Sequence, residues 1–525
     1  MSGFGCNSGN TRICNCEPAI VGLYYAANDD GYPAAVTIRL SFEDGVYREA
    51  DFRIEDLDAR HIAKAVPEFF ADSPKRVNRL IHDLVSRAMR DTSGKVERGL
   101  LVETNGLHRS ADGHVFFVIG QTVIGDVGRP YMIDKSVQSI RTDIVPSSDA
   151  LLRLVELLAV APPAYVLALV FLMVIFLRST ALACGLTLQA VGYIIGQYGR
   201  GKSYLAKLLT GWIISAQSGR QGLIVEAISS QAGTRDEMAR YRDLPLVSDD
   251  VCRSESPRVE AKRIELISNF IRQAANESRI IKKAPGGQTV ELNCQSGAFV
   301  TSEIPFENPS DVTRCLWIPL DKQANTPPEL NSSLIGAAMT FCVAWVCEHY
   351  DRVCDALRNL PTSRWETIST TRAQNNFRLV EGVFQILLTI LRELDCPLKT
   401  REHLQQQFNK AVKASIKAQE AALARFHKPP IIDILREAVD RDMFDIAKKP
   451  ERLWKHEAII WHGDLCIRKD PLERFIRAQL GYEGYTLKRI LQDLKDAGVL
   501  VIQEEGTYQV HITHDAPRTY RIRLK

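Results

Sequence analysis

The sequence carries almost no excess of charge of either sign. Its 525 residues include 66 lysines and arginines against 63 aspartates and glutamates, a formal net charge of +3. A near-neutral chain has no global polybasic signature, so any contact with nucleic acid must come from local patches. With 45% apolar and 25% charged residues, the composition is that of a globular protein and excludes a largely disordered chain.

The sequence also lacks an apolar run of the length that spans a bilayer. The run that most resembles a span, Ala164 to Leu177, is uninterrupted but shorter than the ~20 residues that a transmembrane helix needs. Pro162 and Pro163 precede it, and Arg178 ends it. We therefore expect a buried core helix and no membrane partner, with a membrane segment as the alternative.

Cysteine pairs of the kind that bind zinc are missing as well. The 12 cysteines are scattered, and no C-x-x-C or nearby histidine pair completes a zinc spacing. The sequence shows no secretory signal, so we expect free thiols and a cytoplasmic location. Cys6, Cys14 and Cys16 cluster near the N-terminus, and half of a metal site there stays open as an alternative.

The most informative stretch is a phosphate-binding loop between a strand and a helix. Val191 to Ile195 is a short apolar run that predicts a buried strand. Gly196 to Ser203 matches G-x-x-x-x-G-K-[ST], and a helical apolar period follows it. The glycines let backbone N–H groups approach a polyphosphate, Lys202 supplies charge to the β/γ-phosphates, and the Ser203 hydroxyl can bind Mg²⁺. The predicted nucleotide-binding residues are Gly196, Gly199, Gly201, Lys202, Ser203 and Tyr204.

A second nucleotide signature follows the loop. Leu244 to Asp250 is an apolar strand that ends in two carboxylates, which is typical of a Walker B element. Asp249 is expected to hold Mg²⁺, and Asp250 stands where many such ATPases have a glutamate that orients the attacking water. An aspartate there is one methylene short. The alternative is that the two aspartates cap a helix.

Two arginines downstream are candidates for contacts with the transferred phosphate. Arg314 directly precedes the apolar strand Cys315 to Leu320, where an arginine finger can complete a neighbouring subunit's site. Arg372 opens a strongly apolar helix, and at the start of a lid helix it can act as a second sensor of the nucleotide. The alternative for Arg372 is an ordinary surface arginine.

Basic residues in two further places are candidates for DNA contacts. Residues 279–292 predict a hairpin whose tip is Pro285-Gly286-Gly287, with Lys282 and Lys283 beside the tip; the alternative is a solvated turn. The last sixty or so residues follow the order helix, turn, helix and β-wing, which is typical of a winged helix. Lys488, Arg489 and Arg521 lie in that segment. Such domains bind DNA or protein, and charge alone does not decide between them.

From Gly106 onward the chain resembles the bacterial, phage and mobile-element ATPases of domain-of-unknown-function family 927. These are related to AAA+ helicases of the superfamily-3 and minichromosome-maintenance kind. The resemblance is carried by NGLHRSADGHVFFVIG, GQYGRGKS, TRDEMARYRDLPLVSDD, GAFVTSE, DVTRCLWIPL and TRAQNNFRLVEG, in that order. The chain departs from the pattern at Asp250 and at Thr301-Ser302-Glu303, which lacks the asparagine expected of a sensor-1 residue. The resemblance implies a ring-forming, hexameric AAA+ motor that acts on DNA in the replication of a mobile element.

These observations predict an α/β P-loop NTPase (AAA+-like) core with an N-terminal α+β region, a helical lid and a C-terminal winged helix. The expected boundaries are 1–145, 146–325, 326–460 and 461–525, because a chain of 525 residues is too long for one core. The expected function is an ATP- and Mg²⁺-dependent DNA helicase or translocase that works as a homo-oligomeric ring. A nucleotide-switched assembly or defence ATPase with a protein partner is the alternative, followed by a DNA-packaging or transposition accessory ATPase.

Overall fold

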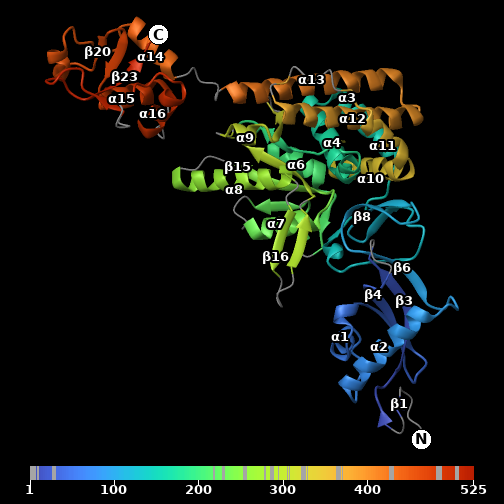
Figure 1. Cartoon of the computed structure of the whole chain (residues 1–525). Helices are drawn as coiled ribbons and strands as arrows, with labels where there is room; N and C mark the ends of the chain where they lie inside the picture. The colour runs from blue at the N-terminus through green and yellow to red at the C-terminus, as the bar shows by residue number, and fades with distance from the viewer. Residues whose placement is uncertain are drawn as a thin grey trace. The chain divides into compact units, whose positions relative to one another are not determined.

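The computed structural model divides the chain into two compact units, residues 1–423 and 424–525 (Figure 1). It describes residues 7–8, 11–26, 31–216, 219–226, 231–251, 257–276, 279–283, 289–293, 295–303, 306, 308–320, 327, 329–361, 368, 370–424, 431–480, 487–502 and 508–524.

The first unit begins with a five-stranded sheet covered by two helices. Its strand order is β10-β6-β3-β4-β5, and a short hairpin, β1–β2, precedes it. Val36, Ile38 and Leu40 alternate along β4 and bury one face of the sheet against α2, whose apolar residues recur at helical spacing. The elements are β1 (Asn7–Ser8), β2 (Thr11–Arg12), β3 (Glu17–Tyr25), β4 (Ala35–Ser41), β5 (Tyr47–Arg53), α1 (Ala59–Ala65), α2 (Pro74–Arg90), β6 (Glu97–Val102) and β10 (Tyr131–Ile133).

Cys14 and Cys16 are buried in this N-terminal core, and the Cys14 thiol donates to the Cys16 carbonyl at 3.2 Å. Cys6 lies outside the described residues. Within the described part of the chain, no group of three or more histidine, cysteine, aspartate or glutamate side chains is placed to hold a metal ion.

A small antiparallel sheet joins this region to the rest of the unit. It contains β7 (Gly106–Arg109), β8 (Val115–Ile119) and β9 (Thr122–Gly125), and it forms the hairpin expected around Asp112-Gly113. The β7 strand is attached to the segment before β15. The Leu107 N–H donates to the Asp243 carboxylate at 3.0 Å, and Asn105 Nδ2 donates to the Arg240 carbonyl.

Three helices, α3 (Ser148–Val160), α4 (Pro163–Phe176) and α5 (Arg178–Ala183), precede the strand that leads into the predicted phosphate loop. All residues of α4 from Tyr165 to Phe176 are buried, and the ring of Phe171 packs edge-on against Phe299 of the central sheet at 5.4 Å. The apolar run is therefore a core helix, as expected. Among the described helices, none is both long and apolar enough to cross a membrane.

The centre of the first unit is a parallel five-stranded sheet of order β14-β15-β18-β12-β19. The strands are β12 (Val191–Ile195), β14 (Ile224–Glu226), β15 (Pro245–Val251), β18 (Gly297–Ser302) and β19 (Cys315–Pro319). Their connections contain α6 (Lys202–Thr210), α7 (Gln231–Arg240), α8 (Pro257–Asn276) and α9 (Pro309–Val312). The chain leaves β12 toward β14 on one side and later places β19 on the other. The carboxyl end of β12 is thus a topological switch point, where open α/β sheets bind ligands.

Two small ladders complete this part. The strands β16 (Arg279–Lys283) and β17 (Thr289–Asn293) form the expected hairpin between α8 and β18. The short strands β11 (Ile140–Arg141) and β13 (Ile214–Ser215) pair with each other. The predicted tip, Pro285-Gly286-Gly287, lies outside the described residues.

The remainder of the first unit is helical. Its helices are α10 (Ser332–Glu348), α11 (Tyr350–Arg358), α12 (Thr371–Glu393) and α13 (Leu398–Ala424). Figure 1 shows α12 and α13 running alongside each other, and the rings of Phe384 and Phe408 stack between them at 3.9 Å. Asn376 of α12 bonds the main chain of Gln189, just before β12, so α12 is attached directly to the start of the parallel sheet.

The second unit is a small α/β fold with its own core. A four-stranded antiparallel sheet of order β20-β21-β23-β22 packs with three helices. The elements are α14 (Ile431–Asp440), β20 (Ala458–Trp461), β21 (Asp464–Ile467), α15 (Lys469–Leu480), α16 (Leu487–Asp496), β22 (Gln509–Val510) and β23 (Thr519–Arg523). In the segment between α16 and β22, Leu500 forms an isolated bridge with Ile522.

Candidate nucleotide site

The predicted phosphate loop lies at the carboxyl end of β12. It begins after Ile195, where the Gly196 N–H donates to the Ser302 carbonyl at the end of β18, and it ends where α6 begins at Lys202. A Cβ at Gly196 would lie 2.7 Å from the Leu320 carbonyl, so this position needs glycine for close approach. Gly201 has a φ of +84°, in the left-handed region that favours glycine.

Lys202 is held inside the loop. Its side chain is 7% exposed, and its Nζ lies 3.1 Å from the Gln197 carbonyl and 3.3 Å from Oε1 of Glu303. A buried ammonium requires such partners because burial disfavours an isolated charge. The structure therefore fixes this nitrogen between the loop's own backbone and the end of β18.

Three oxygen-bearing side chains converge next to the loop. Ser203 Oγ donates to Oδ1 of Asp249 at 2.7 Å, and Thr301 Oγ1 donates to the same oxygen at 2.6 Å. Hydroxyl and carboxylate oxygens are the ligands that Mg²⁺ prefers, with phosphate oxygens and water completing its shell. Ser203 and Asp249 therefore fit an Mg²⁺ ion, which would supply charge to bound phosphates.

The other residues predicted for nucleotide binding surround these groups. Asp249 and Asp250 both lie within β15, and α8 starts only at Pro257, which argues against the helix-cap alternative. The Asp250 side chain lies outside the part of the chain that the structure describes. Tyr204 is half-exposed on the first turn of α6, and Tyr198 in the loop is 89% exposed. An exposed ring beside a nucleotide site is available to stack on a base.

The structure places Arg314 at the opposite edge of the sheet. The Arg314 carbonyl accepts from the N–H of Val191, the first residue of β12, whereas the loop follows the last. Five residues of strand separate the two levels, roughly 16 Å at ~3.3 Å per residue. Arg314 donates to Asn276 and Ser310. Burial and the neighbouring Arg372 guanidinium lower the pKa of Arg314.

Arg372 also lies at this amino edge, because its guanidinium donates to Thr313 Oγ1 at 3.0 Å. The structure therefore groups Arg372 with Arg314 and does not bring either arginine to the loop of its own chain. Arg272 of α8 joins them through an ion pair with Asp311 at 2.8 Å. We refer to Arg272, Arg314 and Arg372 as the arginine cluster.

The residues predicted to contact DNA occupy two places. Lys282 and Lys283 lie in β16 of the hairpin, where their side chains are outside the described part. In the second unit, Lys488 is exposed on α16, and the Arg489 side chain is not described. Arg521 of β23 is partly buried and donates to Asp464 of β21 at 2.7 Å, so its guanidinium helps to hold two strands together.

Sequence reasoning missed the contact between Glu303 and Lys202. The available signal was Thr301-Ser302-Glu303 at the end of an apolar strand, where the family resemblance leads us to expect a sensor-1 residue. That signal did not single out Glu303. Sequence reasoning also missed Asp243, whose buried carboxylate accepts from Leu107, from the Ser179 N–H and from the Ser179 hydroxyl. No local pattern marks Asp243, because its partners lie far away in the sequence.

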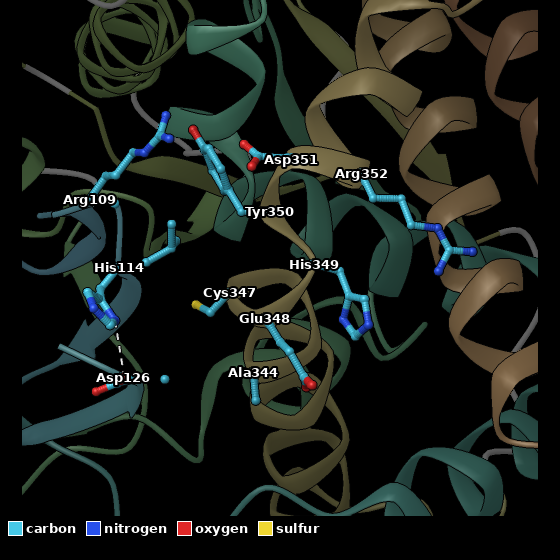
Figure 2. Close-up of a pocket in the computed structure, with 13 residues that line it drawn as sticks. Arg109, His114, Asp126, Ala344, Cys347, Glu348, His349, Tyr350, Asp351 and Arg352 are labelled. Atoms are coloured by element: carbon cyan, nitrogen blue, oxygen red, sulfur yellow. Dashed lines mark ion pairs between the residues drawn. The ribbon is translucent and has the colours of Figure 1, made fainter. Parts of the chain in front are cut away.

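A separate pocket of about 690 Å³ lies between the β7–β9 sheet and helices α10 and α11. Figure 2 shows Arg109 and Tyr350 facing each other across it, with the Arg109 guanidinium 5.6 Å from the ring centre, and the ion pair between His114 and Asp126. Arg352 at its rim pairs with Glu393. Its charges are of both signs, and none of the predicted nucleotide residues lines it.

The chain was compared with known proteins. No protein-family model matches it, and no curated protein matches it. Among solved structures it is similar to one described as "SCCmec type IV Cch - active helicase". The TM-score is 0.53 at 14% sequence identity, over 98% of this chain and 93% of that chain.

Two weaker likenesses are to the apo C-terminal region of NrS-1 and to the JCV helicase. The first has a TM-score of 0.33 at 10% identity, over 94% of this chain and 95% of that chain. The second has a TM-score of 0.20 at 13% identity, over 47% of this chain and 60% of that chain. The likeness to the SCCmec helicase shows a shared fold. The chain is a mixed α/β protein whose parallel sheet fits the P-loop NTPase class, as predicted.

Proposed function

We propose that this protein is an ATP-dependent DNA helicase or translocase that works as an oligomeric ring. The convergence of Lys202, Ser203, Asp249 and Thr301 at the switch point of the parallel sheet carries the proposal. ATP is the substrate, with its β/γ-phosphates on the loop and on Lys202; Ser203 and Asp249 would hold Mg²⁺, which would supply positive charge to the phosphates. The likeness in fold to a structure described as an active helicase supports the same conclusion.

The position of the arginine cluster supports a ring. A guanidinium at the amino edge, with roughly 16 Å of strand between its level and that of the loop, acts on a phosphate only if that phosphate belongs to a neighbour. In a head-to-tail ring, different surfaces of neighbouring subunits meet, and we propose that the amino edge of one sheet faces the loop of the next subunit. Arg314 is then the finger that stabilises charge on the transferred phosphoryl group, and Arg372 is a sensor beside it. A hexamer is the oligomer that the family resemblance implies.

DNA contact is proposed for the hairpin and for the second unit. Lys282 and Lys283 on the β16–β17 hairpin would bind backbone phosphates of DNA in the ring. In the second unit, α15, α16 and the following strands support a winged helix, in which Lys488, Arg489 and Arg521 contribute further phosphate contacts. Residues 326–460 are proposed to serve as lid and linker. We further propose that the protein belongs to family 927, is located in the cytoplasm and acts for a phage or another mobile element.

Two loop variants test the nucleotide site. Lys202→Ala should abolish ATP binding, because the loop loses the one charge that it directs at the β/γ-phosphates. Asp249→Asn should spare much of the ATP binding and stop turnover by weakening the placement of Mg²⁺. ATP affinity is measured with a fluorescent analogue, and turnover by phosphate release. Unchanged ATP affinity in Lys202→Ala would remove the basis of this proposal.

A nucleotide-switched assembly or defence ATPase is the second candidate. It is favoured by the net charge of +3 and by the short Asp250 carboxylate, which suit slow hydrolysis and a protein partner. Strand separation on a forked DNA substrate distinguishes the two. Unwinding that requires ATP and is lost in Asp249→Asn supports the helicase; ATP-driven assembly without unwinding supports the switch.

A further inference from the structure

Glu303 is placed beside the reacting end of the proposed ATP site. It directly follows β18, which pairs with β12 on one side and β15 on the other. Its Oε1 lies 3.3 Å from Nζ of Lys202, and its side chain is 23% exposed. The Gly196 N–H bond to the Ser302 carbonyl ties the start of the loop to the residue before Glu303. The main chain directly before Glu303 is thus bonded to the first residue of the loop.

The other described carboxylate at this edge is already committed. Oδ1 of Asp249 accepts from both Ser203 and Thr301, which suits a metal anchor rather than an acceptor of a water proton. Asp250, the residue that sequence position favours for orienting water, is one methylene shorter than the usual glutamate. Glu303 has the side-chain length of the usual glutamate, and it follows β18, the strand next to β15.

We propose that Glu303 is the carboxylate that orients and deprotonates the attacking water; this rests on the proposed ATPase function. A γ-phosphate oxygen bound by Lys202 shares that nitrogen with Glu303, which brings the carboxylate within one water molecule of the phosphate. The ammonium also offsets the repulsion between the carboxylate and the phosphate. Lys202 therefore keeps a negatively charged base next to a negatively charged substrate.

The reaction is a hydrolysis and balances without a further reactant. The water oxygen forms a bond to the γ-phosphorus as the bond from that phosphorus to the β–γ bridging oxygen breaks. The electron pair of the broken bond leaves with ADP, and one water proton passes to Glu303 and then to solvent. A positioned carboxylate of this kind contributes roughly 10²- to 10⁴-fold to a rate.

The test compares Glu303→Gln with Asp250→Asn in the full chain, by single-turnover hydrolysis and by binding of a fluorescent ATP analogue. Glu303→Gln should reduce the hydrolysis rate by ~10²-fold or more. Its ATP affinity should change by about threefold or less, since Lys202 remains. Glu303→Asp should restore part of the rate. Glu402→Gln, an exposed glutamate on α13, is the matched control.

Each outcome decides the assignment. Tighter ATP binding with an unchanged rate in Glu303→Gln would mean that Glu303 only restrains Lys202, and would overturn the proposal. A large loss confined to Asp250→Asn would overturn it in favour of Asp250. If both variants are slow, the conservative variants decide: partial recovery of the rate in Glu303→Asp supports Glu303, and a faster rate in Asp250→Glu with no recovery in Glu303→Asp contradicts it. Failure of the unmodified protein to bind or hydrolyse ATP would instead overturn the proposed function.

Discussion

The two edges of the parallel sheet differ in what their polar side chains contact. At the carboxyl edge, Ser203 and Thr301 share an oxygen of Asp249, and Lys202 contacts the Gln197 carbonyl and Glu303. At the amino edge, Asp243 and Asp311 accept hydrogen bonds from other parts of the fold. Asp243 bonds β7 and α5, and Asp311 bonds Ser268 and Arg272 of α8.

This difference indicates that the amino edge of the sheet stabilises the fold, whereas the carboxyl edge is arranged for binding a ligand. Carboxylates at the amino edge are saturated by groups of the protein and hold its elements together, so changing them should alter stability. Groups at the carboxyl edge converge on the volume in front of the loop, so changing them should alter ligand binding and rate. The arginine cluster is the exception, because it lies at the amino edge but is proposed to act on the phosphate of a neighbouring subunit.

The largest effect is expected from the arginine cluster. Arg314→Ala should reduce ATP turnover by ~10³-fold, because a finger stabilises charge on the transferred phosphoryl group of an adjacent subunit. Mixing Arg314→Ala with Lys202→Ala subunits should restore some activity, since certain interfaces then pair an intact loop with an intact finger. Arg358→Ala, on the exposed end of α11, is the control. Absence of recovery in rings shown to have mixed would place Arg314 with the structural residues of this edge.

Asp243→Ala should destabilise the first unit by about 3 kcal/mol or more, because the buried donors of Leu107 and Ser179 lose their acceptor. Asp243→Asn keeps one acceptor oxygen, so its stability should lie between that of the unmodified protein and that of Asp243→Ala. Asp243 has a φ of +54°, so Asp395→Ala, an exposed position with a φ of +51°, controls for backbone strain. The measurement is the urea midpoint. Equal losses in Asp243→Ala and Asp395→Ala would show that strain, not hydrogen bonding, sets the cost.

His108 makes the amino edge sensitive to pH. Burial and the nearby Arg242 charge lower the pKa of His108 to about 4, and its Nε2 lies 2.8 Å from the Thr104 carbonyl. Between pH 6.5 and 4 the unfolded chain binds a proton that the folded chain does not, so stability falls as pH falls through this window. The loss from pH 7 to 5 is about 2 kcal/mol.

The check is the urea midpoint at pH 7 and pH 5 in His108→Gln, which keeps a donor but does not titrate. Its pH dependence should be smaller than that of the unmodified protein by this amount. His403→Gln, on an exposed part of α13, should retain the full dependence. An unchanged dependence in His108→Gln would assign the effect to other groups.

The second unit offers a similar comparison, between the exposed Lys488 and Arg521, which is paired with Asp464. Lys488→Ala/Arg489→Ala should flatten the salt dependence of DNA binding by roughly one unit of slope per lost contact, with ATP hydrolysis in the absence of DNA retained. Arg521→Ala, which breaks the bond to Asp464, should show more loss of stability and less change in slope. An unaltered slope with loss of assembly in the double variant would indicate a protein-docking module.

Much of the architecture could be predicted from local pattern. The α4 helix, the β7–β8 and β16–β17 hairpins and the strands β12 and β15 follow from apolar periodicity and turn residues, which act over a few neighbours. The predicted wing is shorter on its first side. Leu500 forms an isolated bridge with Ile522 of β23, flanked by backbone bonds from the Val501 N–H to Arg521 and from the Arg523 N–H to Val499.

The loop could be recognised from the sequence alone, because glycine, lysine and serine at fixed spacing form a local pattern that is typical of phosphate-binding loops. The sequence could not determine which distant groups meet that loop. The contact between Glu303 and Lys202, the shared oxygen of Asp249 and the separation of Arg372 from the loop all depend on strand order. Parallel strands bring residues a hundred positions apart to one edge and send the arginines to the other, and only the tertiary structure decides which edge receives each side chain.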